Sequence, residues 1–279
     1  MTGSPEGRAD RSADLSNADQ PTATQPTAAL PTAALPTAEL STELWNNHAD
    51  WWQDEFTDGV DPEYTEQIIP LVVDAMADRT RIVDIGTGEG QIARALTESG
   101  ASVVGVDPVA GQIAEAAARG GPVRYLRSGA AGLPFADGSF DGAVACLVFE
   151  HIDQVDQAIN EVSRVLAPGG RFLLLLNHPL LQTPGSGWID DQLIDPPEQY
   201  WRIGPYLPEA ATIEEVQKGV FIRFIHRPLS RYVNALAAAG LVIERLDEPA
   251  PPPGFLNQAP QYEAAGTVPR LLAIHTGKM

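Results

Sequence analysis

The chain has 279 residues, and its 37 acidic and 18 basic side chains give a formal net charge of −19. Such an acidic surface repels phosphate backbones and anionic lipid headgroups, so we expect neither nucleic acid nor a membrane as partner. The single cysteine, Cys146, excludes an intrachain disulfide and a cysteine-based zinc site, and the five histidines are scattered, so we expect no metal. Because neither a secretory signal nor an apolar run of bilayer length is visible, we expect a cytoplasmic protein.

The first 40 residues are rich in Ala, Thr and Pro and repeat a Pro-Thr-Ala unit, a composition that cannot bury a core. We therefore expect a disordered tail over residues 1–40 and one domain over residues 41–279. Residues 41–56 hold three tryptophans and predict a helix that Ser41 or Thr42 caps. This helix either packs over the fold or closes over a ligand as a lid; we favour packing, and one helix can do both. A second helix is expected over residues 62–76.

A strand, a glycine loop and a helix follow one another from residue 81 to residue 99, as in the first turn of a doubly wound α/β fold. The glycines are spaced G-x-G-x-G, whereas a dinucleotide fingerprint is spaced G-x-G-x-x-G. Asp84 lies two residues before the first glycine, where its carboxylate would repel a pyrophosphate and suit an ammonium group. A glycine turn that binds nothing is the alternative.

A second strand is predicted over residues 102–106 and ends at Asp107. An acid in this position accepts both hydroxyls of a ribose, or caps the helix expected over residues 110–119. Further strands are expected over residues 123–126, 140–147 and 171–176, with a helix over residues 155–166. Another helix begins at Pro228 and ends at Gly240, and the last strand covers residues 269–275.

Four segments, D-x-G-x-G-x-G, V-V-G-V-D-P, L-P-F-x-D-x-S-F-D and R-V-L-x-P-G-G-R-F-L-L, occur in this order between residues 84 and 174. Together they resemble motifs of the class I S-adenosylmethionine-dependent methyltransferases. The resemblance implies an α/β fold with a doubly wound, Rossmann-like sheet of seven strands whose last strand is antiparallel. The two helices predicted above come before this sheet, and residues 178–227, where the sequence leaves the common core of the family, are expected to form an inserted cap after strand five.

The resemblance implies S-adenosylmethionine as cofactor, with its ammonium end at Asp84, its ribose at Asp107 and its adenine at the backbone N–H of Ala130. Family members usually carry an acidic residue at the position of Gly129, so this sequence departs from the pattern there. The full set of cofactor-binding residues that the resemblance implies is Asp84, Gly86, Thr87, Gly88, Gly90, Asp107, Pro108, Gln112, Gly129, Ala130 and Leu147.

His151 follows the fourth strand, whose end should face the reacting methyl group. It either takes a proton from the acceptor, or orients the acceptor, or only closes the loop. The aromatic residues of the insertion suit a cap over the acceptor pocket and suit a dimerisation surface equally well. Within the insertion, residues 212–226 predict a hairpin.

These observations predict an enzyme that transfers a methyl group from S-adenosylmethionine to a small-molecule acceptor by in-line displacement and releases S-adenosylhomocysteine. A regulatory protein that binds the cofactor without catalysis is one alternative, and a nicotinamide-dependent oxidoreductase is another. The sequence leaves open the acceptor and whether the protein is a monomer or a homodimer.

Overall fold

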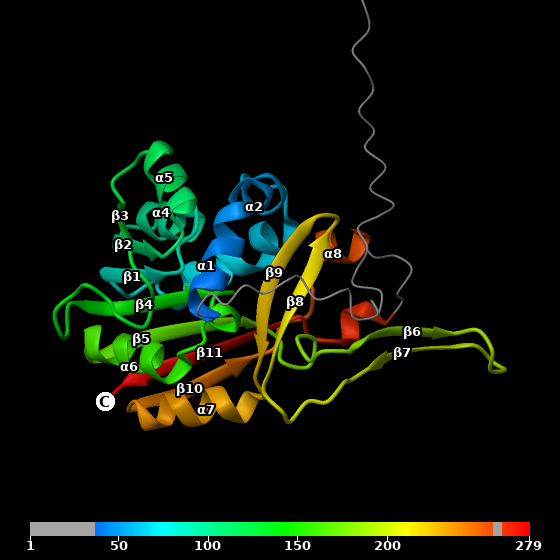
Figure 1. Cartoon of the computed structure of the whole chain (residues 1–279). Helices are drawn as coiled ribbons and strands as arrows, with labels where there is room; N and C mark the ends of the chain where they lie inside the picture. Colours follow the sequence, from blue (N-terminus) through cyan, green and yellow to red (C-terminus); the bar gives the residue numbers. More distant parts are fainter. Residues whose placement is uncertain (1–36, 259–263) are drawn as a thin grey trace, which may run out of the picture.

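The computed structural model describes residues 37–258 and 264–279, so the expected tail lies, up to residue 36, outside the described residues. At its centre is a seven-stranded sheet in the order β10-β11-β5-β4-β1-β2-β3 (Figure 1). Its strands are parallel except β11, which runs antiparallel to both β5 and β10. This arrangement confirms the predicted fold. The strands are β1 (Arg81–Ile85), β2 (Ser102–Asp107), β3 (Arg124–Arg127), β4 (Phe140–Cys146), β5 (Leu166–Asn177), β10 (Leu241–Asp247) and β11 (Leu271–Lys278).

Helices cover both faces of the sheet, with α4 and α5 on one side and α6 and α7 on the other (Figure 1). Their bounds agree closely with the sequence prediction. They are α4 (Gln91–Glu98), α5 (Ala110–Ala118), α6 (Val155–Val165) and α7 (Leu229–Ala238). In addition, α3 (Ile69–Ala75) follows a π-helical turn, η2 (Tyr64–Ile68), and α8 (Pro253–Gln258), which the sequence did not predict, comes after β10 in the chain.

The side chains of β5 show why this sheet is buried on both faces. Phe172, Leu174 and Leu176 pack in a core cluster with α6 and α7, whereas Leu173 and Leu175 pack in a second cluster with α3 and α4. Successive residues of a strand point to opposite faces, so a continuous apolar run is what a strand between two helical layers needs.

The N-terminal region forms two helices, α1 (Thr37–Asn47) and α2 (Ala49–Phe56), with a break at His48. The prediction that Ser41 or Thr42 caps one helix is therefore wrong, because α1 begins before both residues. Residues 37–40, which the sequence assigned to the tail, belong to α1. Among residues 37–258 and 264–279, no helix is long and apolar enough to cross a bilayer.

The insertion after β5 consists of two antiparallel hairpins. The first pairs β6 (Gly187–Asp191) with β7 (Glu198–Arg202), and the second pairs β8 (Ala210–Gln217) with β9 (Val220–His226). The second hairpin is the predicted one, and it stands beside α1 and α2, whereas β6 and β7 extend away from the sheet (Figure 1). Of these two hairpins, the second is thus the one that lies close to the N-terminal helices.

The order of strands reverses between β1 and β4, since the chain runs outward from β1 through β2 to β3 and then returns to β4. In doubly wound sheets the ligand crevice lies at this point, beyond the carboxyl ends of the strands. The segments that begin at Gly86 and at Leu147 meet there.

Candidate active site

The glycine loop leaves β1 with three left-handed residues, because φ is +71° at Gly86, +54° at Gly88 and +89° at Gly90. The backbone N–H of Gly86 donates to the carbonyl of Val106 at 2.8 Å, which ties the loop to the end of β2. A Cβ on Gly86 would lie 2.3 Å from a methyl of Val148. Glycine is therefore required at this position for conformation and for close approach.

One cavity opens at the carboxyl ends of β1, β2 and β4 and is covered by residues of α1 and α2. Every cofactor-binding residue predicted from the sequence lines it except Gly90, and His151 lines it too. A Cβ on Gly90 would lie 2.3 Å from the hydroxyl oxygen of Tyr125, so this glycine makes room for a β3 side chain outside the cavity. The lining residues that the sequence did not predict as site residues include Ser41, Thr42, Trp45, Trp52, Tyr64, Glu89, Cys146, Ile152, Asp153 and Gln154.

Asp84 and Asp107 bring two buried carboxylates to this cavity. The hydroxyl of Thr87 donates to Asp84 Oδ2 at 2.6 Å. The backbone N–H groups of Gly88 and Val109 donate to the two oxygens of Asp107, at 3.0 and 2.8 Å. Val109, and not Asp107, is the N-cap residue of α5, so Asp107 is not the helix cap that the sequence left open as its alternative role.

Burial raises the pKa of both carboxyl groups, because the charged form loses water contact. The pKa of Asp84 rises to about 7, opposed by the hydrogen bond from Thr87 and reinforced by the charge of Asp107. The pKa of Asp107 rises to about 6, opposed by its two backbone hydrogen bonds. Near neutral pH the carboxyl group of Asp84 is therefore partly protonated in the ligand-free protein, and a cationic ligand would stabilise its ionised form.

A second group of lining residues lies beyond β2 and β3. Gln112 is buried on α5, and its side-chain oxygen accepts from Gln53 of α2 at 3.2 Å. Ala130 is also buried, whereas a Cβ on Gly129 would meet nothing within 4 Å. This wall has a polar edge and an open space at Gly129, where a side chain could be added without strain.

The end of β4 carries a strained residue, since Leu147 is not a glycine and has φ +55°. Its N–H donates to the carbonyl of Leu175 at 2.9 Å, which holds the backbone in place. Left-handed non-glycine residues are costly and gather at functional sites. Here the left-handed conformation turns the chain at the end of β4, so that Leu147 and Val148 line the cavity before η3 (Phe149–His151) begins.

His151 is held in a fixed orientation on η3. Its Nδ1 lies 2.8 Å from the carbonyl oxygen of Arg223 on β9. Because a carbonyl can only accept, we assign the proton to Nδ1, which leaves Nε2 as an acceptor. Trp45 and Phe224 pack edge-on and tilted against the ring, at centroid distances of 5.0 and 4.9 Å. Burial lowers the pKa of His151 to about 4, so the ring is neutral at physiological pH.

Helices α1 and α2 are hydrogen-bonded to η3 and to the second hairpin. Ser41 donates from its hydroxyl to the carbonyl of His151 at 3.3 Å. The N–H of Phe221 on β9 donates to Nε2 of His48 at 3.2 Å, and the indole of Trp51 donates to Gln217. The aromatic segment therefore both packs against the fold and covers the cavity, the two roles that its sequence left open.

A family model described as a methyltransferase domain matches residues 83–174. The chain is 37% identical over 123 residues to a demethylmenaquinone methyltransferase of Thermus thermophilus, a match covering 42% of this chain and 55% of that protein. It is 32% identical over 136 residues to the O-methyltransferase resE of Aspergillus sclerotiorum, covering 46% of this chain and 52% of that protein. The chain thus spans about half the length of these curated relatives.

Similarity to a solved structure extends further along the chain. A crystal structure of an S-adenosylmethionine-dependent methyltransferase from Mesorhizobium loti superposes with a TM-score of 0.64 and 28% identity. The match covers 76% of this chain and 96% of that one. The motifs between residues 84 and 174, the order of the sheet and these similarities agree, and they identify residues 83–174 as a methyltransferase domain of the class I S-adenosylmethionine-dependent type.

Proposed function

We propose that this protein transfers a methyl group from S-adenosylmethionine to a small-molecule acceptor by in-line displacement. The observation that carries the proposal is a cavity at the switch point of the sheet that is lined by the glycine loop, by two buried carboxylates and by the aromatic residues Trp45 and Trp52. The cavity thus provides for a cofactor with an ammonium and a ribose, and for a second molecule beside it.

The lining residues fit S-adenosylmethionine in kind. Asp84 is a buried carboxyl group with no cationic side chain paired to it among the described residues, and it would hold the ammonium group of the cofactor. Each oxygen of Asp107 accepts one backbone hydrogen bond and keeps further acceptor capacity for the ribose hydroxyls. The open space beside Gly129, the backbone N–H of Ala130 and the edge of Gln112 would surround the adenine.

The same lining gives little support to a nicotinamide dinucleotide. In the described part of the chain, no Lys or Arg lines the cavity, while four acids do. A pyrophosphate would lie among like charges, with only a glycine loop of the wrong spacing to hold it. The oxidoreductase alternative is therefore the weaker one.

The protein's main contribution to the reaction would be alignment and exclusion of water. S-adenosylmethionine supplies a methyl group that its sulfonium already makes electrophilic. Trp45 of α1 and Trp52 of α2 line the cavity and would exclude water from it. Leu147, in its left-handed conformation, would hold the backbone that lines the cavity after β4. His151, with Nδ1 held by Arg223, would accept a hydrogen bond from the acceptor through Nε2.

We further propose that residues 41–279, together with the part of α1 that precedes them, form one methyltransferase domain, with residues 178–227 as its inserted cap. The contacts of β9 with His48 and His151 support a cap role for the second hairpin. A cytoplasmic location remains part of the proposal and is supported by the single cysteine, Cys146, which is buried.

Turnover tests this proposal. The protein would be incubated with methyl-labelled S-adenosylmethionine and a panel of small aromatic alcohols, amines and thiols, and release of S-adenosylhomocysteine would be measured. We expect release that depends on an acceptor and is lost in Asp84→Asn. Tight binding of S-adenosylhomocysteine without turnover on any acceptor would instead support the regulatory alternative.

A further inference from the structure

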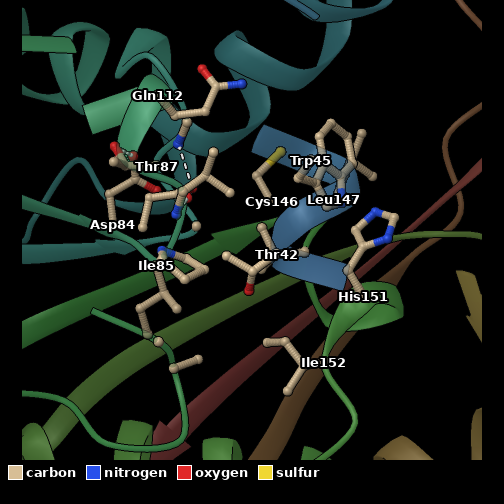
Figure 2. Close-up of a pocket in the computed structure, with 18 of the residues that line it drawn as sticks. Thr42, Trp45, Asp84, Ile85, Thr87, Gln112, Cys146, Leu147, His151 and Ile152 are labelled. Carbon is tan, nitrogen blue, oxygen red and sulfur yellow. Dashed lines mark hydrogen bonds between the residues drawn. The ribbon is translucent and has the colours of Figure 1, made fainter. Parts of the chain in front are cut away.

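The cavity has two ends, and the one away from Asp84 has a chemistry of its own. Figure 2 shows Asp84, Thr87 and Gln112 on one side of the pocket, and Trp45, His151 and Ile152 on the other. We call the second side the acceptor end, formed by Thr42 and Trp45 of α1 and by residues 151–154. The inference below rests on the proposed function, because it asks what this end would bind beside the cofactor.

The acceptor end offers no charge to an ionic ligand. Its single acid, Asp153, is bound through both oxygens by the guanidinium of Arg223, at 2.7 and 3.0 Å. Across the described residues, the cavity lining holds no Lys or Arg. A carboxylate or phosphate on the acceptor would therefore lose water contact without gaining a countercharge, and an ammonium would meet only a carboxylate that Arg223 already binds, so either charge is disfavoured.

The acidic side chains at the cofactor end also have partners already. Glu89 is paired with Arg94 and Arg119 at 2.6 and 3.0 Å. Asp84 accepts from Thr87 and is assigned to the cofactor's ammonium under the proposed function. A cationic acceptor would have to compete for a carboxylate that the cofactor already uses. Only an uncharged acceptor avoids every one of these conflicts.

The acceptor end does offer one directed polar group. Nδ1 of His151 is held by the carbonyl of Arg223, and Nε2 has no hydrogen-bond partner among the described residues. A lone pair with this fixed direction selects a ligand that donates a hydrogen bond. Trp45 packs edge-on against the imidazole ring and lines the same end, which gives a planar ring a surface to contact.

We propose that the acceptor is an uncharged aromatic molecule whose reacting hydroxyl donates a hydrogen bond to Nε2 of His151. As the oxygen lone pair forms the bond to the methyl carbon, the carbon–sulfur bond breaks and its electron pair goes to sulfur, giving a neutral thioether. The hydroxyl proton passes to Nε2 and then to water. A weak base is sufficient for this step, because the hydroxyl becomes a strong acid once its oxygen is methylated.

Three probes of one shape test the charge requirement: β-naphthol, a hydroxynaphthoic acid and an aminomethyl naphthol. Each would be titrated into the protein saturated with S-adenosylhomocysteine, with the fluorescence of the tryptophans as readout. We expect β-naphthol to bind at least about tenfold more tightly than either ion, since a charge that loses water contact at this half-exposed end gains no partner in return. Equal or tighter binding of either ion, or no binding of β-naphthol, would overturn the inference.

Two variants make the test sharper. Gln154 lines the cavity as the N-cap residue of α6 and makes no side-chain capping bond, so Gln154→Lys should fold normally. Because residue 154 is exposed at the rim of the cavity, this variant should bind the hydroxynaphthoic acid about threefold to tenfold more tightly than the wild type does, as a charge-assisted contact would. Gln192→Lys makes the same charge change on the exposed loop after β6 and should leave that affinity unchanged. An equal effect of both variants, or of neither, contradicts the charge argument.

His151→Phe keeps an aromatic ring between Trp45 and Phe224 but removes both nitrogens. It should weaken β-naphthol about tenfold and leave the affinity for S-adenosylhomocysteine unchanged, which also shows that the variant is folded. Unchanged affinity for β-naphthol would refute the role of Nε2. If the wild-type protein fails to bind S-adenosylhomocysteine at all, the proposed function itself falls before any acceptor is added.

Discussion

Lowering the pH should weaken the binding of S-adenosylhomocysteine, because the carboxyl of Asp84 must be ionised to hold an ammonium group. In the free protein, burial raises the pKa of Asp84 to about 7. A ligand that binds the ionised form loses affinity as the pH falls through that pKa. The amino group and the carboxylate of the ligand keep their charges between pH of about 6 and about 8. The titrating groups of the protein therefore determine how the affinity changes with pH in this range.

The magnitude follows from the raised pKa. With a pKa of about 7, the ionised share of Asp84 falls about tenfold between pH of about 8 and about 6, which is about 1.4 kcal/mol of binding free energy. Asp107, whose pKa is about 6, is about half protonated at the lower pH and adds a factor of about two. We therefore expect the dissociation constant to rise about 20-fold in total.

Calorimetry at several pH values checks this prediction, and Asp84→Asn is the matched control. The asparagine oxygen can still accept from Thr87, but the side chain no longer titrates. The variant should bind more weakly at high pH and retain only the twofold dependence assigned to Asp107. A dissociation constant that does not change with pH in the wild type, or an equally steep dependence in the variant, would refute the role given to Asp84.

Three further variants test the site and its support. Asp107→Ala should weaken the binding of S-adenosylhomocysteine by about 1–3 kcal/mol, and unchanged affinity in a folded variant would remove its ribose role. Gly129→Asp should strengthen that binding by about 1–2 kcal/mol, because a Cβ there meets nothing within 4 Å and the carboxylate can reach an amino group. Burial raises the pKa of Glu150 to about 7, and its Oε2 has no partner among the described residues. The folded protein therefore holds this proton better than the unfolded chain does, and stability falls as the pH rises from about 4.5 to about 7. Glu150→Gln should thus stabilise the protein by about 3 kcal/mol at alkaline pH and have little effect below pH of about 4.5, as thermal unfolding can measure.

Most of the sheet was predictable because its strands carry local marks. The apolar run at Phe172–Leu176 predicts a strand whose side chains are buried on both faces of the sheet. The glycines after Ile85 predict a turn with positive φ angles, which other residues rarely adopt. The order of motifs then determined the topology through the family resemblance. The caps of the first helix were not predictable in this way, since Ser41 hydrogen-bonds to His151 on a distant element.

The site was predictable where a residue acts through its place at the end of a strand. Asp84 and Asp107 lie at the carboxyl ends of β1 and β2 and reach one cavity, as the fold requires. Gly90 shows the limit of this reasoning, because it fits the same glycine pattern but makes room for Tyr125 outside the cavity. Only the packing of β3 against the loop distinguishes the two cases.

The acceptor end was the least predictable part of the site. The environment of His151 depends on Arg223 and Phe224, which come 72 and 73 positions later in the chain. Their contact exists because β9 folds back beside α1 and η3, and no local signal in the insertion indicates that register. For the same reason the sequence could not separate the hairpin beside the cavity from the one that extends away.

The most direct test of the account is a calorimetric titration of the protein with S-adenosylhomocysteine, with NADH as the control ligand. We expect binding of S-adenosylhomocysteine in the micromolar range and no binding of NADH, since the cavity has acids for an ammonium and a ribose but, among the described residues, no cation for a pyrophosphate. Binding of NADH, or no binding of S-adenosylhomocysteine, would contradict it.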